Sequence, residues 1–166
     1  RYDSGFLKDS GCYPICASRM IFDEEPSEAF GKLFKNERYC DLSGSAILLY
    51  KNGKTANISY INGSYYQAKY EVWGTDGVIS LDRAYSVPPD FTTKVTLQYN
   101  AENNWKGRRT ETFEIEPKDH FLEMLDTFCM EITGTKKAPF DFEQDLLNQA
   151  NVIELVGSGQ NSANRF

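Results

Sequence analysis

The chain has 166 residues, of which 40% are hydrophobic and 14% aromatic, so it can bury one sizeable core and suits a single domain. Its formal net charge is -6, and no run of Lys or Arg exceeds the pairs Arg108-Arg109 and Lys136-Lys137, which excludes the cation clusters that duplex binding needs. No apolar stretch approaches the roughly 20 residues that span a bilayer, so we expect a soluble, cytoplasmic protein with neither nucleic acid nor membrane as a partner.

The first predicted element is a helix over about residues 10–22, because apolar and long side chains recur there at helical spacing. The recurring positions are Cys12, Ile15, Cys16, Arg19 and Met20. Asp9 or Ser10 is available as the N-cap, and the pattern ends before Pro26.

The cysteines of this helix do not predict a metal site. Cys12 and Cys16 fall one helical turn apart, but the chain has only one histidine, His120, and no second close cysteine pair. With Cys40 and Cys129, they are better explained as small core-filling thiols in a reducing compartment.

From Ser45 onward the periodicity changes to two, which predicts strands. The segments SAILLY and TANISYI flank Asn52-Gly53, whose tolerance of positive φ favours a type I′ turn and therefore a hairpin. Four more extended segments follow, separated by turn signals: YYQAKYEVW, GVISLDRAYS, KVTLQYN and TETFEIE. We therefore predict an α+β fold, with a mostly antiparallel open sheet of about six strands and helices packed on one face.

Alternation along these strands gives the predicted sheet two different faces. The more apolar face carries Ala56, Ile58, Tyr60, Tyr66, Ala68, Tyr70 and Val72. The opposite face is polar with aromatic insertions and includes Lys69, Glu71 and Trp73. We expect helices to cover the first face and the second to support a homodimer or homotetramer.

Two helices are predicted to close the chain. In the first, Asp119 caps a segment that ends near Gly134. Its apolar stripe consists of Phe121, Leu125, Phe128 and Ile132. In the second, Asp141 and Gln144 are spaced like a capping box, and Gly157 and Gly159 end the helix.

Two common catalytic arrangements are not supported. A dinucleotide site usually needs a glycine-rich turn between a strand and a helix, but Gly157-Ser158-Gly159 follows a helix and leads into none. A Ser-His-acid triad would need His120, and the chain has no Gly-x-Ser-x-Gly elbow. We therefore expect no cofactor-binding residue in this chain and interpret His120 as a surface or boundary residue.

The segment DSGCYPICASRMIFDEEP resembles the Asp-x-Gly-x-Tyr/His segment of the Gfo/Idh/MocA oxidoreductases. YQAKYEVWGTDGVISLDRAYSVPPD resembles the strands of their substrate domain, and LLNQANVIELVGSG is similar to their C-terminal helix. Within the family, GSAILL, the turn from Trp73 to Gly77 and LDRAYSVPP most resemble the branch that reduces keto groups on nucleotide-linked deoxysugars. The resemblance covers nearly the whole chain.

The resemblance implies one domain of a two-domain enzyme. An N-terminal Rossmann domain would bind NAD or NADP, and residues 1–166 would form a substrate-binding and oligomerisation domain. The chain begins at Arg1 without an initiator methionine, so we expect a fragment that is inactive without its cofactor domain. The family's catalytic lysine lies in the Rossmann domain, and Lys8 is not assigned its role.

The resemblance also implies roles for matched residues. Tyr13 would donate the proton to the developing alkoxide, and because a phenol has a pKa near 10, a neighbouring cation such as that lysine is needed. Asp9, about 6 Å away on the same helix face, would orient a sugar or nucleotide-sugar substrate. The competing structural interpretation is that Asp9 only caps the helix and Tyr13 packs at its start.

Four further residues are candidates for substrate contact. Gly11, which lacks a side chain, lets a ligand or a neighbouring backbone approach the helix. Arg19 either reaches a nucleotide phosphate or is a solvated surface arginine. Arg83 and Tyr85 share a predicted strand face before the Pro88-Pro89 loop, where the alternatives are packing and ion pairing.

Two other functions stay open at this point. The chain could be a stand-alone carbohydrate-binding or protein-interaction module that uses the sheet face around Trp73 without redox activity. It could also serve different chemistry in the same family, such as oxidation of an inositol or a free sugar, or reduction of biliverdin. Tyr13 stands where several sugar-alcohol oxidising members carry His, which favours carbonyl reduction mildly.

Overall fold

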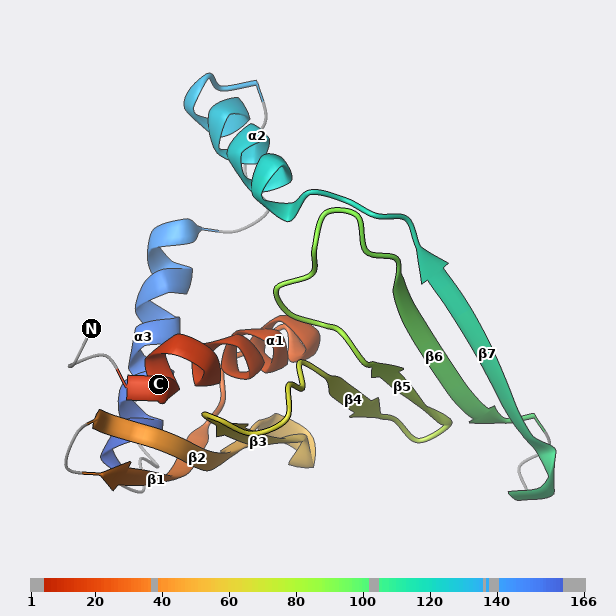
Figure 1. Ribbon diagram of the computed structural model, residues 1–166, viewed down its shortest axis with the longest axis horizontal. Helices are drawn as coiled ribbons and strands as arrows, with labels where there is room; N and C mark the ends of the chain where they lie inside the picture. Colours follow the sequence, from red (N-terminus) through yellow and green to blue (C-terminus); the bar gives the residue numbers. More distant parts are fainter. Residues whose placement is uncertain (1–4, 37–38, 102–104, 136, 138–140, 160–166) are drawn as a thin grey trace. The chain divides into compact units, whose positions relative to one another are not determined.

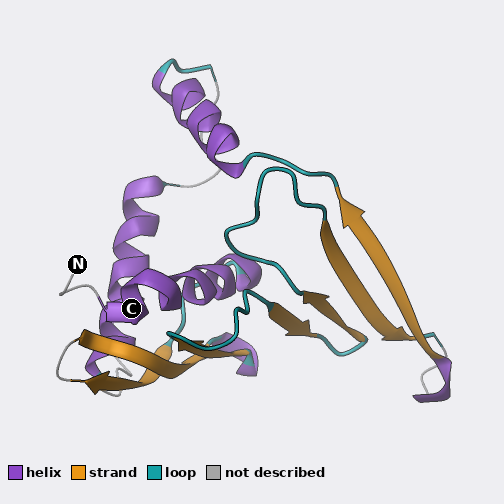
Figure 2. Ribbon diagram, in the orientation of Figure 1, coloured by secondary structure: helices purple, strands orange, loops and turns teal. Residues whose placement is uncertain are grey.

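The computed structural model describes residues 5–36, 39–101, 105–135, 137 and 141–159. They belong to two compact units, one drawn from residues 1–64 and 140–166 and the other from residues 65–139. Each unit contains its own antiparallel sheet, and Figures 1 and 2 show the helices and strands of both.

The first unit is a three-stranded sheet with helices packed on one face. Its strands β1 (Glu28–Asn36), β2 (Tyr39–Leu49) and β3 (Thr55–Ile61) lie in the order β1-β2-β3, and each neighbouring pair is antiparallel. A π-helical turn, η1 (Leu7–Gly11), leads directly into helix α1 (Cys12–Phe22). The long helix α3 (Phe142–Ser158) returns to pack against β1 and α1.

Alternation along the strands decides which face the helices cover. On β2 the side chains of Ala46 and Leu48 are buried, whereas Ile47 between them is 46% exposed. On β3, Ile58 and Tyr60 are buried and Ala56 packs against the same core, as the sequence pattern predicts. The buried core consists of Leu7, Ile15, Ala29, Ala46, Leu48, Tyr50, Ile58, Tyr60, Val152, Leu155 and Val156.

The hairpin between β2 and β3 is confirmed. Asn52 and Gly53 have φ values of 59° and 75°, so both central residues adopt the positive φ that a type I′ turn requires. The strand β1, by contrast, is not predicted by periodicity, because EAFGKLFKN mixes charged residues with a glycine. This strand forms because it pairs with β2, which contacts eight of its nine residues between Glu28 and Asn36.

The second unit contains a four-stranded antiparallel sheet and helix α2 (His120–Ile132). The sheet consists of β4 (Tyr70–Trp73), β5 (Gly77–Leu81), β6 (Thr93–Asn100) and β7 (Arg108–Ile115), in that order. The predicted α+β class and antiparallel pairing are confirmed. The strands of the described residues are nevertheless divided between two sheets, where the sequence predicts one open sheet.

The division falls within the predicted strand YYQAKYEVW. Only its last four residues, Tyr70–Trp73, form β4. Tyr65 and Tyr66 are 89% and 59% exposed. The buried face that the sequence predicts across this segment therefore does not include them. Alternation of side chains predicts a strand, but it does not reveal which neighbouring strand supplies the hydrogen bonds.

Both closing helices begin as predicted. The Asp119 carboxylate accepts hydrogen bonds from the backbone N–H groups of Phe121 and Leu122, and Asp141 caps α3 through Glu143 and Gln144 in the same way. The Gln144 side chain donates to Asn148 rather than back to the cap. Gly159 ends α3 with a φ of 62° in the left-handed region.

Candidate functional site

The chain enters its first helix through the π-helical turn η1 and not through a side-chain N-cap. Phe6 occupies the N-cap position, where no side-chain hydrogen bond forms. Asp9 lies inside the turn and its side chain is exposed. The predicted capping by Asp9 or Ser10 is therefore wrong, because the backbone is already helical at Phe6, before either residue. Such turns, rare overall, are frequent at functional sites.

Asp9 and Tyr13 both face solvent from a helix that is anchored on its other side. Tyr13, the second residue of α1, is 46% exposed, whereas Leu7, Gly11 and Ile15 are buried. Of the purely structural interpretation, the capping by Asp9 is therefore wrong, whereas Tyr13 is half-buried at the start of α1. An acid and a phenol are presented together at the surface.

Gly11 is explained by packing within the unit. A Cβ atom at this position would lie 3.0 Å from Cδ1 and Cε1 of Tyr60 and 3.0 Å from Cδ1 of Leu7. These contacts are tighter than ordinary van der Waals separation. The ring of Tyr60 thus explains why a glycine stands here, and the contact of Gly11 with a ligand stays a prediction.

Two residues that hold η1 in place were not found by sequence reasoning. Asp41 of β2 is 4% exposed, and its Oδ2 atom accepts a hydrogen bond of 2.7 Å from the backbone N–H of Leu7. Tyr60 of β3 is 6% exposed, and burial together with the neighbouring Asp41 carboxylate raises its pKa. No local signal identifies Asp41, because its donor lies 34 residues away.

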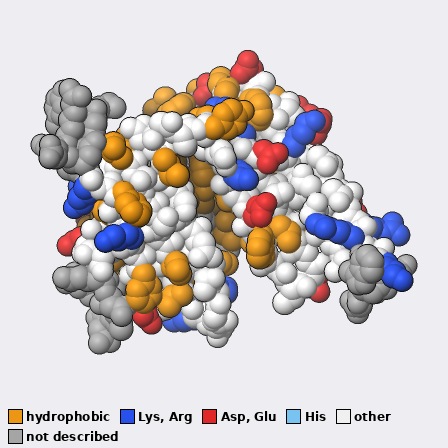
Figure 3. All heavy atoms as spheres, turned by 60° about the horizontal axis from the view of Figure 1, so that its bottom comes forward, with side chains coloured by type: hydrophobic (Ala, Val, Ile, Leu, Met, Phe, Trp, Pro, Cys, Tyr) orange, Lys and Arg blue, Asp and Glu red, His pale blue; other side chains and the backbone are white. Residues whose placement is uncertain are grey.

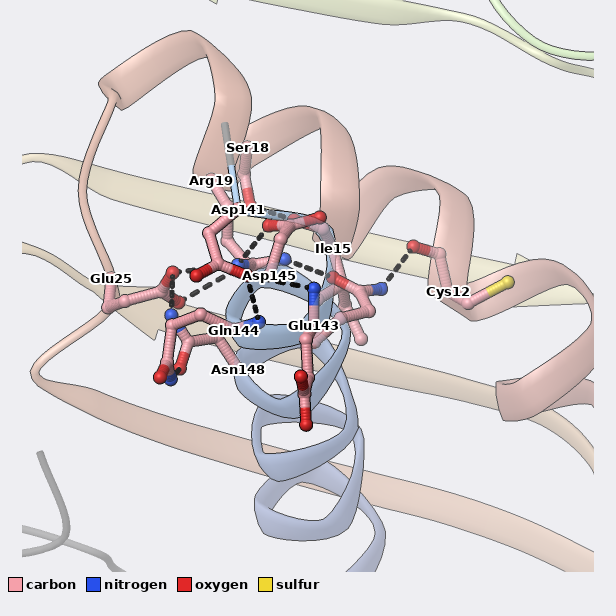
Figure 4. Close-up of polar contacts among 11 residues, drawn as sticks. Cys12, Ile15, Ser18, Arg19, Glu25, Asp141, Glu143, Gln144, Asp145 and Asn148 are labelled. Carbon is pink, nitrogen blue, oxygen red and sulfur yellow. Dashed lines mark hydrogen bonds and ion pairs between the residues drawn. The ribbon is translucent and has the colours of Figure 1, made fainter. Parts of the chain in front are cut away.

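Arg19 is buried and fully engaged, as Figure 4 shows. Its Nε and Nη2 atoms donate to the two carboxylate oxygens of Glu25, both at 2.7 Å. Nη2 also donates to Asp145 of α3 at 2.7 Å, and Nη1 donates to Gln149 at 2.9 Å. The Glu25 hydrogen bonds are the main cause that raises the pKa of Arg19, so the guanidinium is always charged.

The network extends beyond the arginine. The Gln149 side chain donates to the backbone carbonyl of Cys12, and Asn148 donates to Glu25. The side chain of Arg19 is only 6% exposed, so the alternative prediction that it is a solvated surface arginine is wrong. Because its donors join α1, α3 and the segment before β1, we assign Arg19 a structural role in place of the predicted phosphate contact.

Arg83 and Tyr85 lie in the second unit, in an irregular segment after β5. Arg83 donates to the backbone carbonyl of Ser86 at 2.9 Å, and its guanidinium carbon lies 4.9 Å from the ring centroid of Tyr66. The rings of Tyr85 and Tyr70 are 6.0 Å apart. The predicted shared strand face is not formed. Arg83 makes a hydrogen bond and a cation–π contact, and no ion pair of Arg83 is found among the described residues.

Lys69, Glu71 and Trp73 are exposed in or beside β4, as expected for an open face. Trp73 is 78% exposed, and its Nε1–H donates to Glu71 at 3.1 Å. Exposed hydrophobic side chains are frequent on this protein, and on the face drawn in Figure 3 they lie in several separate groups. Exposure of Trp73 alone therefore does not identify an interface.

The described residues contain no group of three or more His, Cys, Asp or Glu side chains that could hold a metal ion. Cys12, Cys16 and Cys129 are free thiols, and burial raises the pKa of Cys12 and Cys16, so both are protonated near neutral pH. The side chain of Cys40 lies outside the described residues. Within that same part of the chain, every helix is too short or too polar to cross a membrane.

The described residues do not fit a nucleotide cofactor either. Of the strands among the described residues, only β7 is followed by an α-helix, α2. The connection, residues 116–119, contains no glycine that could admit a pyrophosphate to the helix N-terminus. The rejection of Gly157-Ser158-Gly159 also agrees with the structure, where these residues end α3.

Comparison with known proteins shows similarity to sugar oxidoreductases. The GFO/IDH/MocA C-terminal domain matches residues 1–80. A dTDP-3,4-didehydro-2,6-dideoxy-alpha-D-glucose 3-reductase from Saccharopolyspora spinosa is 28% identical over 163 residues, covering 94% of this chain and 47% of the reductase. A D-xylose 1-dehydrogenase (NADP(+)) from Haloferax volcanii is 25% identical over 162 residues, covering 96% of this chain and 47% of the dehydrogenase.

The fold is shared with a solved reductase. The crystal structure of the 3-ketoreductase KijD10 from Actinomadura kijaniata, in complex with TDP-benzene and NADP, matches with a TM-score of 0.82 at 22% identity. The match covers 94% of this chain and 47% of KijD10. The chain thus spans about half the length of the relatives it matches.

Proposed function

We propose that the chain, whose residues 1–80 match the GFO/IDH/MocA C-terminal domain, is the substrate-binding and assembly half of an NAD(P)-dependent oxidoreductase of that family. The proposed reaction is reduction of a keto group on a nucleotide-linked sugar. The similarity to the Saccharopolyspora 3-reductase supports this choice of substrate class. The chain alone is expected to be inactive.

The observation that carries the proposal is the exposure of Asp9 and Tyr13 on either side of the buried Gly11. Asp9 sits in an uncapped π-helical turn, and Tyr13 is 46% exposed at the start of α1. Asp9 does not cap its helix in the way that Asp119 and Asp141 cap theirs. Their placement supports a role toward a ligand.

The proposed chemistry needs one proton from this chain. When a ketone is reduced, hydride adds to the carbonyl carbon and the carbonyl oxygen becomes an alkoxide, which must be protonated. The Tyr13 hydroxyl donates that proton and leaves a phenolate that is protonated again from solvent. The Asp9 carboxylate accepts hydrogen bonds from sugar hydroxyl groups and fixes the orientation of the ring.

NAD or NADP supplies the hydride in this proposal. Because the described residues do not fit a pyrophosphate, we assign cofactor binding to another part of the complete protein. The chain matches only 47% of the Saccharopolyspora reductase, which leaves room for such a part. We favour NADP over NAD for two reasons. The Haloferax relative is a D-xylose 1-dehydrogenase (NADP(+)), and KijD10 was crystallised in complex with NADP. The cytoplasmic location stays a prediction.

A substrate panel tests the proposed function. The complete natural protein is assayed with NADPH and NADH against dTDP-linked keto sugars, and with NADP against free aldoses. We expect NADPH oxidation with a dTDP-keto sugar, with kcat in the ordinary enzymatic range of roughly 1 to 1000 per second. Absence of turnover with every keto sugar, beside activity with D-xylose, would replace reduction by sugar oxidation.

The alternative of a stand-alone binding module is not favoured. The similarity to complete oxidoreductases extends over more than nine-tenths of the chain, including both units. Oxidation of a free sugar remains a second candidate, because the Haloferax relative is a D-xylose dehydrogenase and the same acid and phenol can pass a proton in either direction.

We further propose that the face with Lys69, Glu71 and Trp73 mediates self-association. Trp73 is 78% exposed, and a buried aromatic anchor often dominates an interface. Changing Trp73 to Ala should weaken the dimer by about 2 kcal/mol or more, measured by sedimentation velocity over a protein dilution series. The matched control is Tyr65→Ala, at an equally exposed aromatic. Unchanged sedimentation of the Trp73 variant would exclude this face.

A further inference from the structure

The π-helical turn η1 contacts two side chains of the sheet, Asp41 of β2 and Tyr60 of β3. The Leu7 N–H, which has no partner inside the helix, donates to Oδ2 of Asp41 at 2.7 Å. Both residues are 4% exposed, so water does not compete for this bond. Asp41, on strand β2, thus accepts the hydrogen bond that an N-cap side chain would ordinarily accept, although it lies far from η1 in the sequence.

The ring of Tyr60 limits how closely the backbone of η1 approaches the sheet. Its ring is the surface that a Cβ at Gly11 would meet at 3.0 Å, and its hydroxyl oxygen is the atom that a Cβ at Gly44 would meet. The side chain is therefore enclosed between η1 and β2. Its hydroxyl is fully buried near the Asp41 carboxylate, and it has no hydrogen bond of standard geometry among the described residues.

The two contact points, Leu7 and Gly11, alternate with the proposed reactive pair along the chain. Leu7 is two residues before Asp9, and Gly11 lies between Asp9 and Tyr13. A shift of the turn on its support would therefore move both exposed side chains together. Displacements of about 1 Å at a reacting group can cost about 100-fold in rate.

We propose that Asp41 and Tyr60 are positioning residues that hold the turn Leu7–Gly11 and thereby place Asp9 and Tyr13 toward the substrate. The assignment rests on the proposed function for its catalytic consequence. Neither residue touches the substrate, because both are buried in the core of the first unit. Their effect on the reaction passes through the backbone of η1.

The test compares Asp41→Ala, Asp41→Asn and Tyr50→Phe in the complete natural protein, below the melting temperature of each variant. Asp41→Ala removes the acceptor for Leu7 and should lower kcat by about 10-fold or more, with KM for NADPH unchanged. Asp41→Asn keeps an oxygen acceptor of the same shape and should restore kcat to within about 3-fold of the natural protein. Loss of kcat without rescue by Asn would overturn the positioning role.

Tyr50→Phe is the matched control for lost stability. Tyr50 is as buried as Asp41, at 4%, and its hydroxyl shares a buried hydrogen bond of 2.8 Å with Ser18 on the later part of α1. This variant should lower the melting temperature while leaving kcat at the natural value. Equal losses of kcat in Tyr50→Phe and Asp41→Ala would reduce Asp41 to a general stabilising residue and overturn the inference.

Amide hydrogen exchange separates this inference from the proposed function. In Asp41→Ala, the amides of Leu7 to Tyr13 should exchange faster by about 10-fold or more, and in Tyr50→Phe they should not. Unchanged exchange in Asp41→Ala would overturn the inference even in an active enzyme. Faster exchange in a protein that reduces no keto sugar would support the anchoring of η1 and reject the function alone.

Discussion

Replacing Tyr13 by Phe in the complete natural protein is expected to lower kcat for the keto sugar by about 100-fold or more, because general acid catalysis typically contributes 10²–10⁴-fold. The change removes only the phenolic oxygen. Because Tyr13 is 46% exposed and outside the buried core, the melting temperature should stay within a few degrees of the natural value. KM for NADPH should not change, since the described residues do not fit the cofactor.

The matched control for this experiment is Tyr65→Phe. Tyr65 is also an exposed tyrosine, at 89%, but it belongs to the second unit and is not assigned to the site. Its substitution should leave kcat unchanged. If Tyr13→Phe turned over keto sugar as fast as the natural protein, Tyr13 would have no part in proton transfer, and the proton source would have to be sought elsewhere.

Replacing Arg19 by Ala is expected to lower the free energy of unfolding by about 3 kcal/mol, the lower end of the range for breaking a buried ion pair. The arginine is 6% exposed, while Glu25 and Asp145 are 29% and 46% exposed and can regain some hydration. Without the guanidinium, the carboxylate of Glu25, in the segment before β1, and that of Asp145, on α3, repel each other. Urea unfolding followed by circular dichroism gives the difference.

Two further variants provide reference values for the stability lost in Arg19→Ala. Arg19→Lys keeps the charge but loses the paired hydrogen bonds to Glu25, so it should be destabilised less than Arg19→Ala. Lys118→Ala breaks the exposed pair with Glu123 and should cost less than about 1 kcal/mol. An Arg19→Ala loss as small as that of Lys118→Ala, together with a raised KM for the nucleotide sugar, would restore the phosphate contact predicted from sequence.

The helix α1 and its leading turn thus carry two kinds of residue. Asp9 and Tyr13 face solvent, and we propose that they contact the substrate. Gly11, Ile15 and Arg19 face inward, where they contact Tyr60, the hydrophobic core and the acidic residues of the network. Substitutions on the first set should change turnover, and those on the second should change stability.

The sequence by itself determined the features that depend on neighbours along the chain. Asp119 and Asp141 cap helices because a short carboxylate reaches N–H groups two and three residues ahead. Asn52 and Gly53 make the hairpin because their own φ preferences suit it. The Asp9, Gly11, Tyr13 spacing and the segments that resemble the family were likewise readable, because a motif is a local pattern.

Only the tertiary structure decided the features that depend on residues far apart in sequence. Asp41 lies 34 residues from Leu7, and Arg19 lies 126 residues from Asp145, so no local pattern predicts either contact. The same holds for the division into two sheets and for the pairing of β1 with β2. Burial and charge pairing are set by which segments meet in space. Only the positions of Tyr60, Glu25 and Asp145 show that Gly11 lies against a buried ring and that Arg19 forms two ion pairs.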